Sequence, residues 1–137
     1  MRLQAGVSSF IRETLDRGNF VEIHSPKLVG GESESGAGVF KTDYFGDVAC
    51  LAQSPQLYKQ MAVAGDLGRV YEIGPVFRAE NSNSKRHLCE FTGLDFEMAI
   101  DEHYLEAVDV GHAAFKKLFD GLEEEYAKEL DTVRRRF

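Results

Sequence analysis

Arg78, Asp95 and Glu97 have side-chain types and a spacing that suit chemistry on a charged ligand. Arg78 ends a β-rich run, residues 69–79, and the two acids lie in a second β-rich run, residues 91–100. Because strand side chains alternate with period two, Asp95 and Glu97 share one face of their strand. A guanidinium facing carboxylates can hold a phosphate while the acids hold a cation or an amine. A cross-strand salt bridge on a half-exposed sheet explains the same spacing, so both interpretations stay open.

Gln56 and Lys59 form a second candidate pair, on a helix expected after Pro55. Residues three apart on a helix emerge as neighbours, whereas Leu57 and Met61 tend toward another face. An amide beside an ammonium suits a small ligand that carries a carboxylate. An ordinary solvated helix face is the alternative.

Phe91 and His87 are ambiguous from their positions alone. An aromatic ring at a loop-to-strand junction can stack on a base, but it can equally belong to a core. His87 is either a phosphate partner or a surface residue. The sequence has no glycine-rich phosphate loop of the Walker or dinucleotide type, no GxSxG and no metal-binding histidine pair. Hydrolase and Rossmann-type functions therefore have no support.

Helices and strands that would position these residues follow from the apolar spacing. Helices are predicted over residues 2–17, ending in a left-handed Gly18, and from Ser54–Pro55 to about Ala64, ending at Gly65. Short strands are predicted over residues 20–23, 39–45 and 47–52, and the runs 69–79 and 91–100 are predicted to form a long antiparallel pair. Residues 29–38, rich in glycine, serine and glutamate, predict a mobile loop.

The last third of the sequence predicts one long amphipathic helix from about Glu102, broken near Gly111 or Gly121. With the elements before it, this order predicts the α+β class: an antiparallel sheet flanked by helices. A length of 137 residues with 43% apolar side chains fits one domain or a piece of one.

Composition limits the possible partners and surroundings. The net charge of −7 excludes a broadly basic surface for nucleic acid, so any RNA contact is local, as at Lys85, Arg86 and His87. The N-terminus lacks the apolar block of a signal peptide, and we expect a soluble, cytoplasmic protein without membrane contact. The two cysteines, Cys50 and Cys89, cannot form a disulfide framework and are expected to be reduced.

Residues 70–99, VYEIGPVFRAENSNSKRHLCEFTGLDFEMA, closely resemble the second conserved motif of class II aminoacyl-tRNA synthetases. FRAE (77–80), RHLCEF (86–91) and the spacing of Asp95 and Glu97 fit the aspartyl, asparaginyl and lysyl subgroup. AQSPQLYKQ (52–60) and EFTGLDFEMA (90–99) look like the aspartyl enzymes of archaeal and eukaryotic type. The resemblance extends over residues 1–137 and implies part of a class II catalytic core.

The resemblance implies ATP-binding roles for four residues. Arg78 would bind the α-phosphate and stabilise the charge that develops as aspartate attacks and pyrophosphate leaves, which makes it the catalytic residue. Glu80 would recognise the adenine amino group, Phe91 would stack beneath adenine, and His87 would contact the distal phosphates.

The resemblance also implies an aspartate site. Ser33 and Glu34 would belong to a loop that closes over aspartate, with Glu34 and Gln56 near its ammonium group. Lys59 would pair with the side-chain carboxylate, with Asp95 positioning the selecting charges and Glu97 lining the same pocket. A neutral amide would leave the Lys59 charge unpaired, so Lys59→Ala should impair aspartate activation far more than ATP binding.

Partners follow from the same resemblance. Pro26 lies in a segment that resembles the dimer-forming first motif, which implies a homodimer. Residues 81–85 would lie near the acceptor end of tRNA(Asp). Nothing in the sequence resembles the third motif, and the acidic residues that hold Mg²⁺ with ATP, a second aspartate-selecting arginine and an anticodon-binding barrel are also missing.

Two functions therefore remain. The resemblance implies an aspartate–tRNA ligase, of which these 137 residues are an N-terminal catalytic fragment expected to be inactive alone. A truncated, non-catalytic relative that binds a nucleotide, an amino acid or a synthetase subunit is the alternative. A related ligase that forms asparagine is disfavoured, because it too would need the third motif.

Overall fold

The computed structural model describes residues 1–31, 38–82 and 84–136 of the chain. They form two compact units, one built from Met1–Val21 and Met98–Phe137 and the other from Glu22–Glu97. The expected α+β class is confirmed, with helices and two small sheets. No helix among the described residues is long and apolar enough to cross a membrane.

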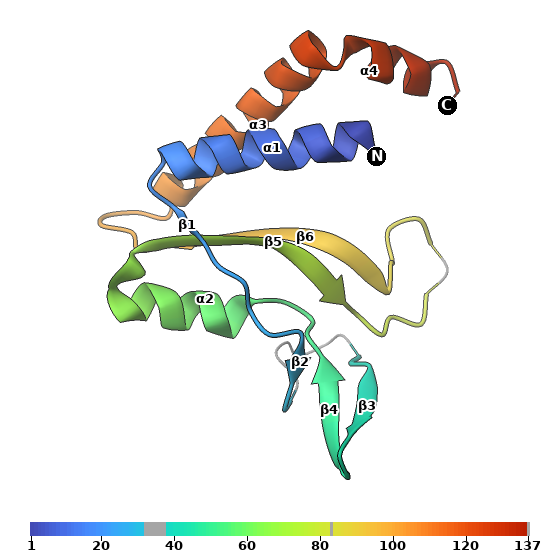
Figure 1. Ribbon diagram of the computed structural model, residues 1–137. Helices are drawn as coiled ribbons and strands as arrows, with labels where there is room; N and C mark the ends of the chain where they lie inside the picture. Colours follow the sequence, from blue (N-terminus) through green and yellow to red (C-terminus); the bar gives the residue numbers. More distant parts are fainter. Residues whose placement is uncertain (32–37, 83, 137) are drawn as a thin grey trace. The chain divides into compact units, whose positions relative to one another are not determined.

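The first unit is helical and consists of α1 (Arg2–Arg17), α3 (Leu105–Glu125) and α4 (Ala127–Arg134). Helix α1 lies along α3 (Figure 1). The apolar stripe of α1 buries Phe10, Ile11 and Leu15, and α3 contributes Ala114 and Leu118. This is the amphipathic pairing that the sequence pattern predicts.

The ends of these helices differ from the prediction at two places. The residue with a left-handed backbone after α1 is Asn19 (φ 60°). Gly18, for which this was predicted, has a φ of −80°. The C-terminal helix is broken at Tyr126, where φ is −120°, and not at a glycine. Gly121 lies inside α3, where a Cβ would stand 2.7 Å from the Phe10 ring. That glycine serves close helix packing and leaves the helix intact.

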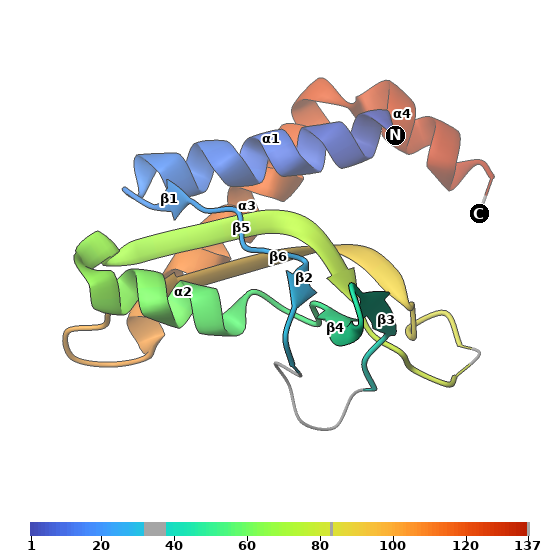
Figure 2. The ribbon, with the colours of Figure 1, turned by 60° about the horizontal axis from the view of Figure 1, so that its bottom comes forward.

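The second unit is built around a sheet with the strand order β1-β5-β6. Its strands are β1 (Val21–Glu22), β5 (Arg69–Phe77) and β6 (Glu90–Met98). Strands β5 and β6 run in opposite directions as the predicted long hairpin, and α2 (Gln56–Ala62) lies along one of their faces (Figure 2). Beyond the strand ends, the amide of Arg78 donates to the carbonyl of Cys89 at 2.9 Å.

A smaller sheet of this unit has the order β2-β4-β3. It contains β2 (Leu28–Val29), β3 (Lys41–Tyr44) and β4 (Asp47–Leu51), and Tyr44 pairs with Asp47 across the predicted hairpin. Phe45 (φ 53°) and Gly46 (φ 92°) make the turn, where two positive φ angles match the twist of a tight hairpin. Val29, predicted to lie in a loop, is instead a strand residue paired with Cys50.

Helix α2 ends earlier than predicted. It stops at Ala62 and continues as the π-helical turn η1 (Val63–Leu67). The positive φ angles that reverse the chain belong to Asp66 (66°) and Gly68 (69°), whereas Gly65 has a φ of −87°. The predicted stop at Gly65 is therefore wrong, although a left-handed backbone does end the helix.

Candidate functional site

One face of the β5–β6 hairpin carries most of the residues that the sequence singles out. Alternation places every second residue of a strand on the same side. On β5 and just beyond it this set is Glu72, Gly74, Val76 and Arg78; on β6 it is Phe91, Gly93, Asp95 and Glu97. The hairpin thus brings Arg78 and the two acids to one surface, as the sequence predicts.

Lys59 is the centre of a charged cluster on this face. Its ammonium lies 3.3 Å from Oδ1 of Asp95 and 3.4 Å from Oε2 of Glu97, and its side chain is 4% exposed. Gln56 donates from Nε2 to the same Glu97 oxygen at 3.1 Å. Both acids keep partial exposure, 34% and 24%, so the carboxylates face outward while the ammonium lies beneath them.

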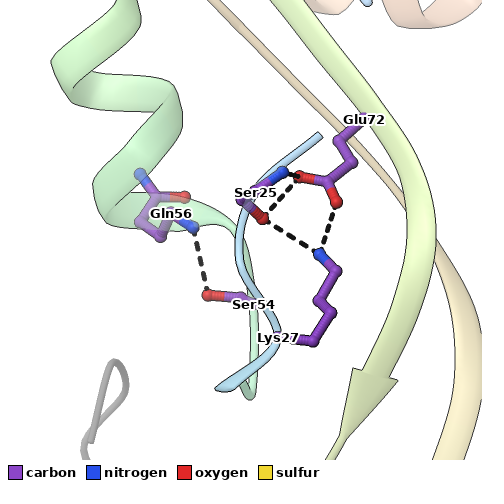
Figure 3. Close-up of polar contacts among 5 residues, drawn as sticks. All are labelled: Ser25, Lys27, Ser54, Gln56 and Glu72. Atoms are coloured by element: carbon purple, nitrogen blue, oxygen red, sulfur yellow. Dashed lines mark hydrogen bonds and ion pairs between the residues drawn. The ribbon is translucent and has the colours of Figure 1, made fainter. Parts of the chain in front are cut away.

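Gln56 and Lys59 both lie in the first turn of α2. Ser54 accepts a hydrogen bond from the Gln56 amide at 3.3 Å (Figure 3), although Pro55, not Ser54, occupies the N-cap position. On another side of the helix, Leu57, Tyr58 and Met61 line a largely apolar pocket of about 330 Å³ with Gly30 and Gly31. The predicted separation of the polar and apolar faces of α2 is confirmed.

The other end of the hairpin holds the four residues predicted to bind ATP, Arg78 and Phe91 at the strand ends and Glu80 and His87 in the loop between the strands. The Arg78 guanidinium carbon lies 5.6 Å from the Phe91 ring centroid. Nε2 of His87 lies 3.6 Å from Oε2 of Glu80, and Nδ1 of His87 shares a 2.6 Å hydrogen bond with Ser84.

These two groups of residues are separated along the strand. Asp95 is four residues beyond Phe91, which corresponds to about 13 Å at a strand rise of about 3.3 Å per residue. The face therefore offers an aromatic and cationic end and, one small molecule's length away, a mixed-charge end.

Some predicted residues are not placed with the rest. Ser33 and Glu34 lie outside the described residues. Before that stretch, Gly31 lines the apolar pocket beside α2, and after it the Gly38 carbonyl accepts from the Ala79 amide at 2.8 Å. Pro26 is exposed, and its role in a dimer stays a prediction.

A second buried polar cluster was not predicted from the sequence. The carboxylate of Glu72, which is 3% exposed, accepts from the Ser25 amide at 3.1 Å, from the Ser25 hydroxyl at 2.6 Å, and from the Lys27 ammonium (Figure 3). The ammonium also donates to the Ser25 hydroxyl at 2.9 Å. The one signal in the sequence was a glutamate at an inward position of an otherwise apolar strand.

Comparison with known proteins identifies the family. Residues 1–137 match the family model described as tRNA synthetases class II (D, K and N). The chain is 57% identical over 132 residues to a cytoplasmic aspartate–tRNA ligase of Dictyostelium discoideum, covering 96% of this chain and 23% of the relative.

Solved structures give the same result. A structure titled as a putative aspartyl-tRNA synthetase from Leishmania major is 51% identical with a TM-score of 0.91, covering 99% of this chain and 26% of that one. An asparaginyl-tRNA synthetase from Pyrococcus horikoshii, solved with asparaginyl-adenylate, is 34% identical with a TM-score of 0.89, covering 96% and 30%. The chain thus spans about a quarter of the length of its curated relatives. It belongs to the class II tRNA synthetase family of the D, K and N type.

Proposed function

We propose that the polypeptide carrying these residues is an aspartate–tRNA ligase, which activates L-aspartate with ATP and transfers it to the acceptor end of tRNA(Asp). The observation that carries the proposal is the two-ended face of the β5–β6 hairpin. Arg78 and Phe91 at one end suit a phosphate and a base, and Lys59 with its two carboxylates suits an amino acid that bears a second carboxylate. The family membership and the aspartate-specific relatives support it.

Lys59 would select aspartate by exchanging partners. In the free protein its ammonium is shared by Asp95 and Glu97. The substrate's side-chain carboxylate would take up that ammonium, and the substrate's own ammonium, near Gln56 and Glu34, would compensate the acids. Asparagine brings the same ammonium but a neutral amide, which leaves the buried charge poorly paired.

Activation itself would occur between the two ends of the face. A carboxylate oxygen of aspartate attacks the α-phosphorus of ATP, the bond from that phosphorus to the bridging oxygen breaks, and pyrophosphate leaves. Arg78 would stabilise the charge on the phosphoryl oxygens. Phe91 would stack on adenine, Glu80 would accept from its amino group, and His87 would turn from Glu80 toward the distal phosphates.

Magnesium, a homodimer and a cytoplasmic location complete the proposal. Among residues 1–31, 38–82 and 84–136 there is no cluster of three or more acidic, histidine or cysteine side chains that could hold a metal ion. The side chains that hold Mg²⁺ with ATP would therefore lie mainly outside these residues. Pro26 would lie at the dimer interface, and Ser33 of the closing loop would contact aspartate.

The test is aspartate-dependent exchange of pyrophosphate into ATP, measured with the polypeptide as its source cells make it. We expect Lys59→Ala to raise the KM for aspartate by about a hundredfold while the KM for ATP changes little, because a charge that pairs with the substrate is lost. Lys116→Ala, which removes an exposed lysine of the helical unit, is the matched control and should leave both values unchanged. Equal loss for the two substrates would remove the assigned role of Lys59, and a wild-type protein without exchange would favour the non-catalytic relative.

A further inference from the structure

The buried cluster of Ser25, Lys27 and Glu72 lies directly beside the charged cluster of Lys59. Lys27, Glu72 and Asp95 line the same small cavity, which leaves no room for a water molecule. Of the residues that line it, Glu72 and Asp95 are the only two with a carboxylate, and Lys27 is the only one with a positive charge. The side chains of Lys27 and Asp95 are 23% and 34% exposed, so solvent partly screens their charges, whereas Glu72, 3% exposed, is the least screened carboxylate beside the ammonium.

Two glycines keep the space between the clusters open. A Cβ at Gly74 would stand 2.9 Å from Oε1 of Glu72, and a Cβ at Gly93 would stand 2.8 Å from Cγ2 of Val76 and 3.5 Å from Oδ2 of Asp95. A side chain at Gly74 would therefore crowd the Glu72 carboxylate, and one at Gly93 would clash with Val76 while meeting Asp95 at an ordinary contact distance. The two glycines let the strands keep this close packing between the acids.

Lys27 is also tied by its backbone to the segment that leads into α2. Its carbonyl accepts from the Ala52 amide at 2.9 Å, and the Ala52 carbonyl accepts from the Phe77 amide at 3.0 Å. Ala52 is followed by Gln53, Ser54 and Pro55, where α2 begins. The position of Lys27 and the start of α2 are therefore set by the same strand-like contacts.

We propose that Glu72 is a positioning residue for aspartate selection, because it holds the Lys27 ammonium in the Ser25–Glu72 cluster and so leaves Asp95 to Lys59. The kinetic consequence of this inference rests on the proposed function, whereas the exchange of ion-pair partners does not. If Glu72 lost its charge, the Lys27 ammonium would turn to Asp95 as the remaining carboxylate of the cavity. Lys59 would then lose one of its two partners, and the aspartate site would lose its arrangement.

Glu72→Gln tests this with almost no change in shape, since a glutamine oxygen can still accept from Ser25. We expect the KM for aspartate to rise about tenfold, with the KM for ATP within about twofold, because the change redirects a charge in the amino-acid end alone. The double variant Lys27→Met/Glu72→Gln removes both charges, and the aspartate KM should return to within about threefold of the wild type. A purely structural role predicts no such recovery. Asp120→Asn, the same type of change in an exposed pair of α3, is the matched control and should have no effect.

Crystal structures of the wild type and of Glu72→Gln give a second measurement that needs no activity. The proposal expects Asp95 within hydrogen-bond distance of Lys27 in the variant and of Lys59 in the wild type. An unchanged Lys59–Asp95 pair in the variant would overturn it, whatever the kinetics show. A double variant whose KM for aspartate is no lower than that of Glu72→Gln would also overturn it.

If the wild type shows no aspartate-dependent exchange, the proposed function fails, and the crystal structures still decide the inference. If Glu72→Gln does not fold while the double variant does, the Lys27 ammonium finds no new partner in the single variant, and the proposal is overturned.

Discussion

The helical unit, Met1–Val21 with Met98–Phe137, keeps its ion pairs at the surface, whereas the unit of Glu22–Glu97 places charged groups inside. The pair Lys116–Asp120 of the first unit has side chains 65% and 62% exposed. In the second unit, Lys59 and Glu72 are each 3% exposed. Exposed pairs contribute little to stability, and buried ones seldom repay their desolvation. Among the described residues, the buried charged side chains thus belong to the unit that carries the candidate site.

The largest effect is expected where the helical unit depends on apolar packing. Phe10 is 5% exposed and packs edge-on against Tyr126 at a centroid distance of 6.1 Å. Phe10→Ala should lower the free energy of unfolding by about 3–4 kcal/mol, measured by urea titration with circular dichroism. Phe119→Ala is the matched control, because that ring is 61% exposed, and it should cost well under about 1 kcal/mol. Similar losses for the two variants would contradict an apolar core in this unit.

A smaller effect on stability is expected from the buried charge of the other unit. Lys59→Met should lower the free energy of unfolding by about 2 kcal/mol, because it leaves Asp95 and Glu97 facing each other without their shared cation. Their partial exposure keeps the loss below that of a fully buried pair. Lys116→Met should change stability by a few tenths of a kcal/mol at most, about the value of an exposed helix pair. An equal loss in the free energy of unfolding for both variants, in the same urea titration, would contradict the difference between the two units.

The smallest effect is expected at an exposed pair of the helical unit. A hydrogen bond from Arg2 to Glu129, 3.1 Å long, lowers the pKa of that carboxyl below its usual value. A depressed pKa in the folded state stabilises the protein above the unfolded pKa, and that stabilisation is lost as the pH falls through the folded value. Carbon-13 titration by NMR should show a lower pKa for Glu129 in the wild type than in Arg2→Met. The same pKa in both proteins would mean that the hydrogen bond does not form in solution.

The sequence predicts the arrangement best where one period governs a long segment. The stripe of α1 and the alternation that puts Asp95 and Glu97 on one face are both periodic, and both are confirmed. The helix pattern around Gln56 and Lys59 likewise leads to a shared partner, Glu97. The residues that meet in the cluster were therefore predictable, while their individual roles come from the family resemblance and remain proposals.

Features that depend on distant contacts were missed. Ser25 and Glu72 are 47 residues apart, and no local pattern relates them. The last helix breaks at Tyr126 and not near Gly111 or Gly121, where a break was expected, and at Gly121 the Phe10 ring packs against the helix. After α1, the left-handed conformation falls on Asn19 and not on Gly18. Glycine and asparagine can both adopt it, so the sequence alone did not decide between these neighbours.

The two cysteines differ in a way that experiments can use. Cys50 is buried in β4, whereas Cys89 is exposed, and its thiol lies 3.7 Å from the Glu80 carbonyl. Of these two thiols, a maleimide dye would therefore attach at Cys89 and spare Cys50. The dye would sit at the base of the loop that carries Glu80 and His87, so its fluorescence would report rearrangements of that loop in real time.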